Sequence, residues 1–298
     1  VNSGNANSFT GRAGDRTVTR TVKAAAKIFN SPEKEIFVAS TGIIGEPLPP
    51  GYVASKLPDI KKRLTPRAWA MAAKAIMTTD TFAKGATRQA MIDGVPVVIN
   101  GIAKGSGMIA PDMATMLSFI FTDATIPAPV LQKLLVRATS RSFNSITVDS
   151  DTSTSDTVLL CATGKGEPHR KVCSSSDRHL RDFRKKLEDL MQELARQIVR
   201  DGEGASKFVT IQISGGASEK AARRIGLAVA NSPLVKTAIA GGDANWGRVV
   251  MAVGKTGEKV DRDLLSISMG GIPIARKGEI IKGYDEKPVA AHLKGSEI

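Results

Sequence analysis

The sequence is poor in the residues that enzymes often use for metal binding and proton transfer: it has two cysteines and three histidines in 298 residues. Two cysteines do not establish a disulfide framework. Cys161 follows an apolar run and is typical of a buried thiol, whereas Cys173 lies in a polar stretch with nothing that marks it as catalytic. The three histidines, His169, His179 and His292, show no zinc-ligand spacing. We therefore expect no metal site and no nucleophile that depends on a histidine.

Long apolar runs are missing as well, so the sequence predicts no membrane-spanning helix. No basic and apolar signal peptide opens the chain, and an intracellular, reducing setting is the expectation. A composition with 42% hydrophobic and 24% charged residues is ordinary for a globular chain of this length. Such a chain can bury one large core or two modest ones.

The net charge of +13 attracts phosphates and so raises the question of nucleic-acid binding. Aromatic residues, which help to decide that question, are few, at 4%. Residues 165–186 hold eight Lys or Arg against three Asp or Glu. Nucleic-acid recognition commonly interleaves basic residues with aromatic residues that stack on bases, and this segment does so little. We interpret it as a basic loop that leads into a surface helix, and we expect no nucleic-acid partner.

The most informative stretch is residues 104–120, where a Gly-rich approach leads through Ala114 and Thr115 into an apolar run. A threonine hydroxyl is a poor nucleophile, but cleavage between Ala114 and Thr115 would free an α-amino group able to take its proton. That amine titrates near neutral pH, at about 7.7 to 8 in model peptides, so Thr115 could act as its own base. Thr115 could equally be an ordinary residue that begins a strand.

A second segment favours acyl transfer. The β-favouring residues 36–39 run into a polar turn at 40–47, which contains Thr41 and Gly42. A Thr-Gly pair at the end of a strand can offer a hydroxyl and a backbone N–H to a developing oxyanion. On its own the segment is also compatible with a simple turn.

Three further motifs accompany these two, at residues 1–7, 77–81 and 241–248, the last containing Asp-Ala-Asn-Trp-Gly-Arg. With all five in this order, the chain resembles the ornithine acetyltransferase (glutamate N-acetyltransferase) family of arginine biosynthesis over its whole length. The resemblance implies a precursor that cuts itself between Ala114 and Thr115. It also implies that Thr115 takes the acetyl group from N-acetylornithine and passes it to glutamate.

The resemblance assigns the remaining site residues. Thr41 and Gly42 match the oxyanion hole, and Thr81, Lys104 and Glu203 match the substrate contacts. Lys104 is a reasonable partner for a substrate α-carboxylate, and Glu203 could meet an amine. The family implies no metal or organic cofactor, leaves open whether acetyl-CoA also donates acetyl groups, and implies that the two cleaved chains assemble as a heterotetramer. Its expected location is the bacterial cytoplasm, or the mitochondrial matrix in a eukaryote.

Other functions remain open at this level. A related N-terminal-nucleophile aminopeptidase would share the cleavage and the acyl-enzyme, whereas a basic nucleic-acid-binding protein or a noncatalytic remnant would share neither activity. Lys104 and Glu203 could also be solvated surface charges, and Thr81 a turn residue. The family carries a segment before residue 1 and a C-terminal tail with substrate contacts that have no counterpart here, so we expect a truncated C-terminal part.

The pattern of apolar residues predicts an α+β fold with mostly antiparallel sheets. Asp93-Gly94 predicts a hairpin between residues 87–92 and 95–100, Asp15 and Ser218 are candidate helix caps, and Pro66 is a candidate helix start. Helices are expected at 17–29, 66–76, 130–141, 178–199, 218–230 and 245–253, and strands at 116–121, 157–161, 207–214 and 264–269. The resemblance adds a four-layer αββα sandwich at 1–205, with the cleavage site inside it, and a smaller α+β domain at 206–298.

Overall fold

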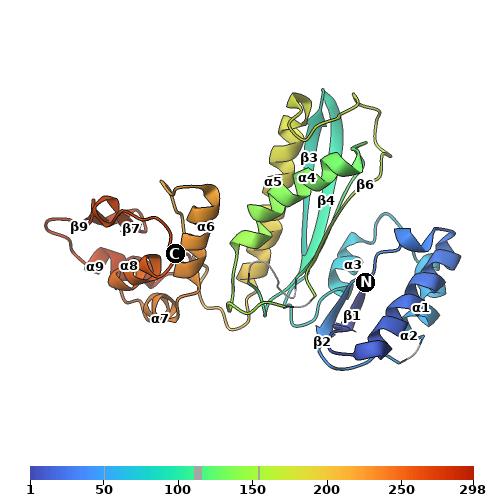
Figure 1. Ribbon diagram of the computed structural model, residues 1–298, viewed down its shortest axis with the longest axis horizontal. Helices are drawn as coiled ribbons and strands as arrows, with labels where there is room; N and C mark the ends of the chain where they lie inside the picture. The colour runs from blue at the N-terminus through green and yellow to red at the C-terminus, as the bar shows by residue number, and fades with distance from the viewer. Residues whose placement is uncertain (50, 111–115, 154) are drawn as a thin grey trace. The chain divides into compact units, whose positions relative to one another are not determined.

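The computed structural model describes residues 1–49, 51–110, 116–153 and 155–298. The chain forms two compact units, Val1–Glu203 and Gly204–Ile298, which are described separately (Figure 1). Both units combine helices with sheets, so the fold is a mixed one of α and β elements.

A four-stranded sheet organises the first unit. Its strands are β3 (Lys84–Ile92), β4 (Val95–Lys104), β5 (Leu117–Thr122) and β6 (Thr157–Ala162), in that order across the sheet. Neighbours run antiparallel except β5 and β6, which are parallel. The predicted hairpin is confirmed: Asp93 and Gly94 adopt φ of 52° and 84°, the left-handed values that a tight two-residue hairpin turn requires.

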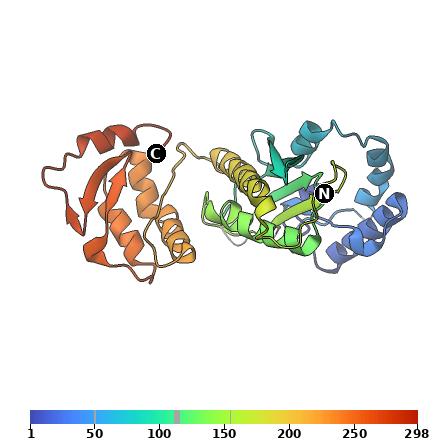
Figure 2. The same ribbon diagram turned by 90° about the horizontal axis from the view of Figure 1, so that it is seen from above.

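Helices cover one face of this sheet. Figures 1 and 2 show α4 (Ala128–Ser140) and α5 (Arg181–Arg200) lying against it. Alternate residues of β4, among them Val97 and Ile99, point into this layer because successive strand residues face opposite sides. The predicted long helix is therefore confirmed as α5, whose buried stripe is Phe183, Leu187, Leu190, Met191, Leu194, Ala195 and Ile198.

The other face of the sheet holds a smaller apolar cluster, formed by Ala39, Ala73, Ile76, Ile102, Leu117 and Phe119. Ala73 comes from α3 (Trp69–Ala75), whose Trp69 ring packs edge-on against Phe121 with centroids 5.7 Å apart. Lys104 occupies the same face of β4 as Ile102 and extends this layer with a charged group.

A short parallel pair of strands from the N-terminal part of the chain supplies part of the site. β1 (Asn2–Asn5) pairs with β2 (Ser40–Ile43), and the intervening chain forms α1 (Gly11–Phe29). α1 packs on α2 (Tyr52–Lys62). Short 3₁₀ turns occur at Glu33–Glu35, Phe143–Ser145, Arg178–Leu180 and Arg262–Leu264.

The second unit contains four helices and a small sheet among its described elements. The helices are α6 (Glu219–Ala230), α7 (Pro233–Gly241), α8 (Gly247–Gly254) and α9 (Lys287–Leu293), and the antiparallel strands are β7 (Ile267–Met269), β8 (Ile272–Arg276) and β9 (Glu279–Ile280). The predicted cap is confirmed, since the Ser218 hydroxyl accepts from the Ala221 N–H at 3.1 Å. Ser232 caps α7 in the same way.

Several sequence-based boundaries are wrong. The expected strand at 36–39 lies instead at Ser40–Ile43, because pairing with β1 sets its position, so Thr41 sits in a strand and not in a turn. The expected strand at 207–214 is reduced to one bridge between Phe208 and Glu297. Asp15 lies inside α1 rather than capping it, and α3 starts at Trp69, three residues after Pro66.

Gly101 is a point of close approach between the sheet and α5. A Cβ at this position would lie 2.9 Å from a methyl carbon of Leu190 and 2.9 Å from one of Leu194. We expect Gly101→Ala to lower the free energy of unfolding by about 1 to 3 kcal/mol, because the helix must move away from the sheet.

Gly85→Ala is the matched control, because it lies on the neighbouring strand with its nearest contact at an ordinary 3.6 Å. Urea unfolding measures both variants. Equal effects of the two substitutions would contradict the close packing at Gly101.

Candidate active site

A pocket of about 450 Å³ opens in the first unit. Its lining comes from segments that are far apart in sequence: β1, the end of β2, residues 77–79, residues 107–108, and the side chains of Ser153, Ser155 and Glu203. Hydroxyl groups and one carboxylate therefore converge on a space of the size that a small ligand occupies.

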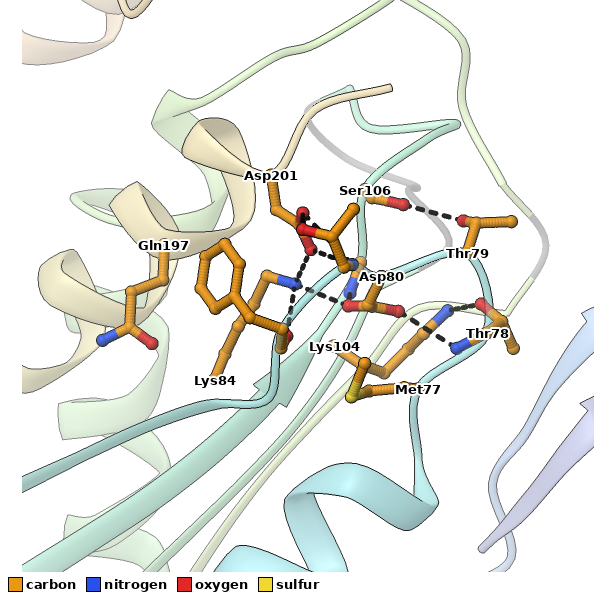
Figure 3. A network of polar contacts seen from close by, with 12 residues as sticks. Met77, Thr78, Thr79, Asp80, Lys84, Lys104, Ser106, Gln197 and Asp201 are labelled. Carbon is orange, nitrogen blue, oxygen red and sulfur yellow. Dashed lines mark hydrogen bonds and ion pairs between the residues drawn. The ribbon is translucent and has the colours of Figure 1, made fainter. Parts of the chain in front are cut away.

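Lys104 does not itself line the pocket but is hydrogen-bonded to the pocket residue Thr78. It is the last residue of β4 and is 2% exposed. Its Nζ donates to Thr78 Oγ1 at 2.8 Å, as Figure 3 shows, and to Thr41 Oγ1 at 3.0 Å. Burial lowers the pKa of Lys104, while the negative charge of Asp80 acts in the opposite direction. An ammonium held so deeply is suited to meeting an anionic substrate group.

Asp80 joins the two chain segments that meet at Lys104. Its Oδ2 accepts from the Thr78 N–H at 3.1 Å, and its Oδ1 accepts from the Gly105 N–H and from Lys84 Nζ, both at 2.7 Å (Figure 3). Burial raises the pKa of Asp80, but these donors outweigh it and leave the pKa below its ordinary value. The carboxylate therefore stays ionised beside Lys104.

Thr81, the threonine expected to contact substrate, has a different set of partners. Its N–H and its hydroxyl both donate to Asp201, at the end of α5, and it does not line the pocket. Thr78 does line the pocket and carries the hydroxyl that accepts from Lys104. The structure therefore brings Thr78 to the pocket wall and binds Thr81 to Asp201, and the substrate contact expected at Thr81 stays a prediction.

The predicted oxyanion pair lies in β2. Thr41 is fully buried, and the neighbouring Gly42 lines the pocket. Gly42 has φ of 130°, and an added Cβ would lie 2.4 Å from the carbonyl carbon of Gly4 on β1. Only glycine fits here, since both the backbone conformation and the neighbouring strand exclude a side chain.

Glu203 reaches the pocket from the segment that follows α5. Its N–H donates to the Ser106 carbonyl at 2.9 Å, and its carboxyl group lies against Gly107. Two stretches that follow β4 and α5 are thereby joined. Ser106 is held in addition by a 2.7 Å hydroxyl contact with Thr79 (Figure 3).

The predicted cleavage site, Ala114 and Thr115, lies outside the described residues. The residue that follows it, Met116, is held at both backbone groups: its N–H donates to Asp156 at 2.9 Å, and its carbonyl accepts from Thr157 at 3.0 Å. Desolvation of its carboxyl group raises the pKa of Asp156 to about 6, against the lowering effects of the Met116 N–H and of Lys104.

Sequence reasoning missed Thr78, Asp80 and Asp156. Residues 77–81 were recognised as a motif, but the pattern Thr-Thr-Asp-Thr does not say which hydroxyl faces a pocket. Asp156 carries no sequence signal beyond its place before a strand. In the described ranges, no group of three His, Cys, Asp or Glu side chains could hold a metal ion. No helix in the part of the chain that the structure describes is long and apolar enough to cross a membrane.

Comparison with known proteins identifies the chain. The sequence profile of the ArgJ family matches residues 1–298. The "Arginine biosynthesis bifunctional protein ArgJ" of Gluconobacter oxydans is 55% identical over 298 residues, and that of Rhizobium meliloti is 55% identical over 300; both alignments cover all of this chain and 70% and 73% of the relatives. The crystal structure of the Bacillus halodurans ArgJ protein is 38% identical, with a TM-score of 0.56 over 60% of this chain and 83% of that one.

These findings first define a class: the protein is an acetyltransferase of amino-acid biosynthesis. More narrowly, the chain belongs to the ArgJ family. Its reaction is acetyl transfer from N-acetylornithine to glutamate, and self-cleavage is characteristic of the family.

Gly107 tests the place of Glu203 in the pocket. A Cβ at residue 107 would lie 2.7 Å from the Glu203 carboxyl carbon, so Gly107→Ala should displace that flexible side chain with little effect on folding. We expect KM for the amino-acid substrates to rise roughly tenfold, as for the loss of one charge-assisted contact.

Gly254→Ala is the control, because a Cβ there meets no atom within 4 Å. Steady-state kinetics and thermal unfolding of both variants separate binding from stability. An unchanged KM in Gly107→Ala would remove Glu203 from the set of substrate contacts.

Asp156 gives a prediction for pH dependence. The folded state keeps its proton up to about pH 6, whereas the unfolded chain loses it near 3.8, so the folded state binds more protons between these values. This contribution to stability is present at low pH and is lost as the pH rises through about 6. We expect Asp156→Asn, in an uncut Thr115→Ala background, to gain stability relative to its parent between pH 4 and 7.

Urea unfolding across this pH range provides the measurement. Asp59→Asn in the same background is the control, because the Asp59 side chain is 69% exposed. A difference between the Asp156 variant and its parent that stays constant with pH would contradict a raised pKa.

Proposed function

We propose that Thr115 is the nucleophile of acetyl transfer in this protein and that self-cleavage at Ala114-Thr115 creates it. The observation that carries the proposal is the buried Lys104 ammonium, which donates to Thr41 and to Thr78. Thr78 lines the pocket together with Gly42 and Glu203. Lys104 and Thr115 lie in one sequence segment, and Met116 is anchored directly after it.

The substrates account for the charged groups. N-acetylornithine and glutamate both carry an α-carboxylate, and Lys104 is a charge-assisted partner for it. Thr78 supplies a hydroxyl beside that ammonium, and we propose it as a substrate contact alongside the expected Thr81. Glu203 would meet an amine of the substrate, since its carboxylate faces the same pocket.

The chemistry proceeds in two balanced steps. The Thr115 hydroxyl oxygen attacks the acetyl carbonyl carbon while the free α-amine takes the hydroxyl proton. The C–N bond to ornithine then breaks, the proton passes to the leaving amine, and an acetyl-threonine ester remains. The neutral amine of glutamate attacks this ester and forms the new C–N bond, its nitrogen gives up a proton to the Thr115 α-amine, and the threonine oxygen leaves and takes that proton.

Thr41 and Gly42 would stabilise the negative oxygen of both tetrahedral intermediates. Because the Thr41 oxygen accepts from Lys104 Nζ, its own hydroxyl hydrogen can be directed at another acceptor. The adjacent Gly42 allows a close backbone approach at the pocket wall, where a donor to the same oxygen is required.

Features of the whole enzyme complete the proposal. We retain the four-layer αββα arrangement for the nucleophile-bearing part, residues 1–205, and a smaller domain at 206–298. The two cleaved chains would remain together as a heterotetramer in the bacterial cytoplasm. The name "bifunctional" borne by the relatives supports acetyl-CoA as a second acetyl donor, without a bound cofactor.

Denaturing intact-mass spectrometry tests the nucleophile. We expect the purified protein to separate into chains 1–114 and 115–298, and Thr115→Ala to stay whole. Thr87→Ala, an exposed threonine in the β3 strand, should still be cut.

Ornithine release from N-acetylornithine tests the reaction, with and without glutamate. Release that requires glutamate and disappears in Thr115→Ala supports acetyl transfer. Cleavage followed only by glutamate-independent hydrolysis would indicate a related hydrolase, and an uncut, inactive folded protein would contradict the proposal.

A further inference from the structure

Three charged side chains form a buried cluster behind the pocket. Lys84 is 0% exposed, Asp80 8% and Asp201 5%. Lys84 Nζ donates to Asp80 at 2.7 Å and to Asp201 at 2.5 Å (Figure 3). Buried ion pairs of this kind cost much desolvation energy, and apolar residues of similar volume often give equal stability. Stability alone is therefore a weak explanation for the cluster.

None of the three side chains lines the pocket, yet Asp80 holds the backbone at or beside both partners of the contact between Lys104 and the pocket residue Thr78. Asp80 binds the backbone of Thr78 and the backbone of Gly105, the residue that follows Lys104. The hydrogen bond from Lys104 Nζ to Thr78 Oγ1 therefore joins two segments that Asp80 has already brought together.

The cluster also has an unbalanced charge. It contains two carboxylates and one ammonium, which leaves one excess negative charge beside Lys104. Lys84 donates to the same Asp80 oxygen that accepts from the Gly105 N–H. Lys84 also donates to Asp201, which lies at the end of α5. The position of the Asp80 carboxylate is thus determined by three different segments of the first unit.

We propose that Asp80, held in place by Lys84 and Asp201, is a positioning residue: its hydrogen bonds to the backbones of Thr78 and Gly105 fix Thr78 and Lys104 beside each other and direct the ammonium at the substrate carboxylate. This inference rests on the role of Lys104 in the proposed function. It assigns the buried cluster to substrate binding rather than to folding alone.

The charges around Lys104 support this role. Burial lowers the pKa of Lys104, Asp80 raises it, Lys84 lowers it, and Glu203 and Asp156 raise it. Asp80 and Lys84 therefore act in opposite directions on Lys104, although they are partners in one ion pair. A purely structural cluster would respond in the same way to the loss of either partner.

The experiment is the pH profile of kcat/KM for N-acetylornithine, which reports ionisations of the free enzyme. We expect Asp80→Asn to shift the alkaline limb to lower pH, because Lys104 then loses its proton more readily. At the pH where the wild type retains half of its plateau, this variant should fall to about one fifth of that value. Lys84→Met should shift the same limb to higher pH.

Asp59→Asn is the control. It removes a carboxylate that is 69% exposed and takes no part in the cluster, so the limb should stay in place. If Lys84→Met does not fold, the double variant Lys84→Met/Asp201→Asn removes one charge of each sign and should show the same upward shift.

The proposal is supported if the alkaline limb moves to lower pH in Asp80→Asn, moves to higher pH in Lys84→Met and stays in place in the control. Equal losses of activity in the Asp80 and Lys84 variants, with an unmoved limb, overturn it and leave a structural cluster. Failure of the proposed function is distinguishable, because Lys104→Met would then retain the wild-type kcat/KM and the wild-type alkaline limb.

Discussion

The placement of one lysine ammonium inside the first unit is the constraint on which the site depends. Lys104 ends a strand, so β4 directs it away from the α5 layer and toward the face that carries Thr41. A charge at this depth requires partners, and they come from β2, from the Thr78 segment and from the electrostatic field of Asp80. The hydrogen bonds of this single group therefore join chain segments whose neighbours Ala39, Ile76 and Ile102 already pack in one apolar cluster.

The two faces of the central sheet differ in character: one is covered by a large apolar layer, and the other carries the polar residues of the site. On one face, α4 and α5 bury a large apolar layer, and Gly101 permits close contact with Leu190 and Leu194. On the other face, a smaller apolar cluster gives way at the end of β4 to polar residues. A rigid apolar layer behind the sheet holds the strand ends in position, which is what a charged site requires.

Sequence patterns predicted the elements whose signals are local. Asp93-Gly94 specified the hairpin, the apolar stripe at 183–198 specified α5, and Ser218 specified the start of α6. Boundaries that depend on a distant partner were wrong: β2 takes its place from β1, and residue 208 pairs with the end of the chain. The same division holds for the site: the resemblance predicted Lys104, Gly42 and Glu203 as site residues, but the bond from Lys104 to Thr78 could not be predicted from it.

By itself the sequence determined the family, because the order and spacing of five unusual motifs are properties of the linear chain. It also determined the hairpin and the long helix, since turn chemistry and a repeating apolar stripe act over a few residues. Only the tertiary structure decided that Thr78 accepts from Lys104 while Thr81 is bound to Asp201. Hydrogen bonds between segments depend on three-dimensional geometry, which two threonines three residues apart do not encode in their spacing.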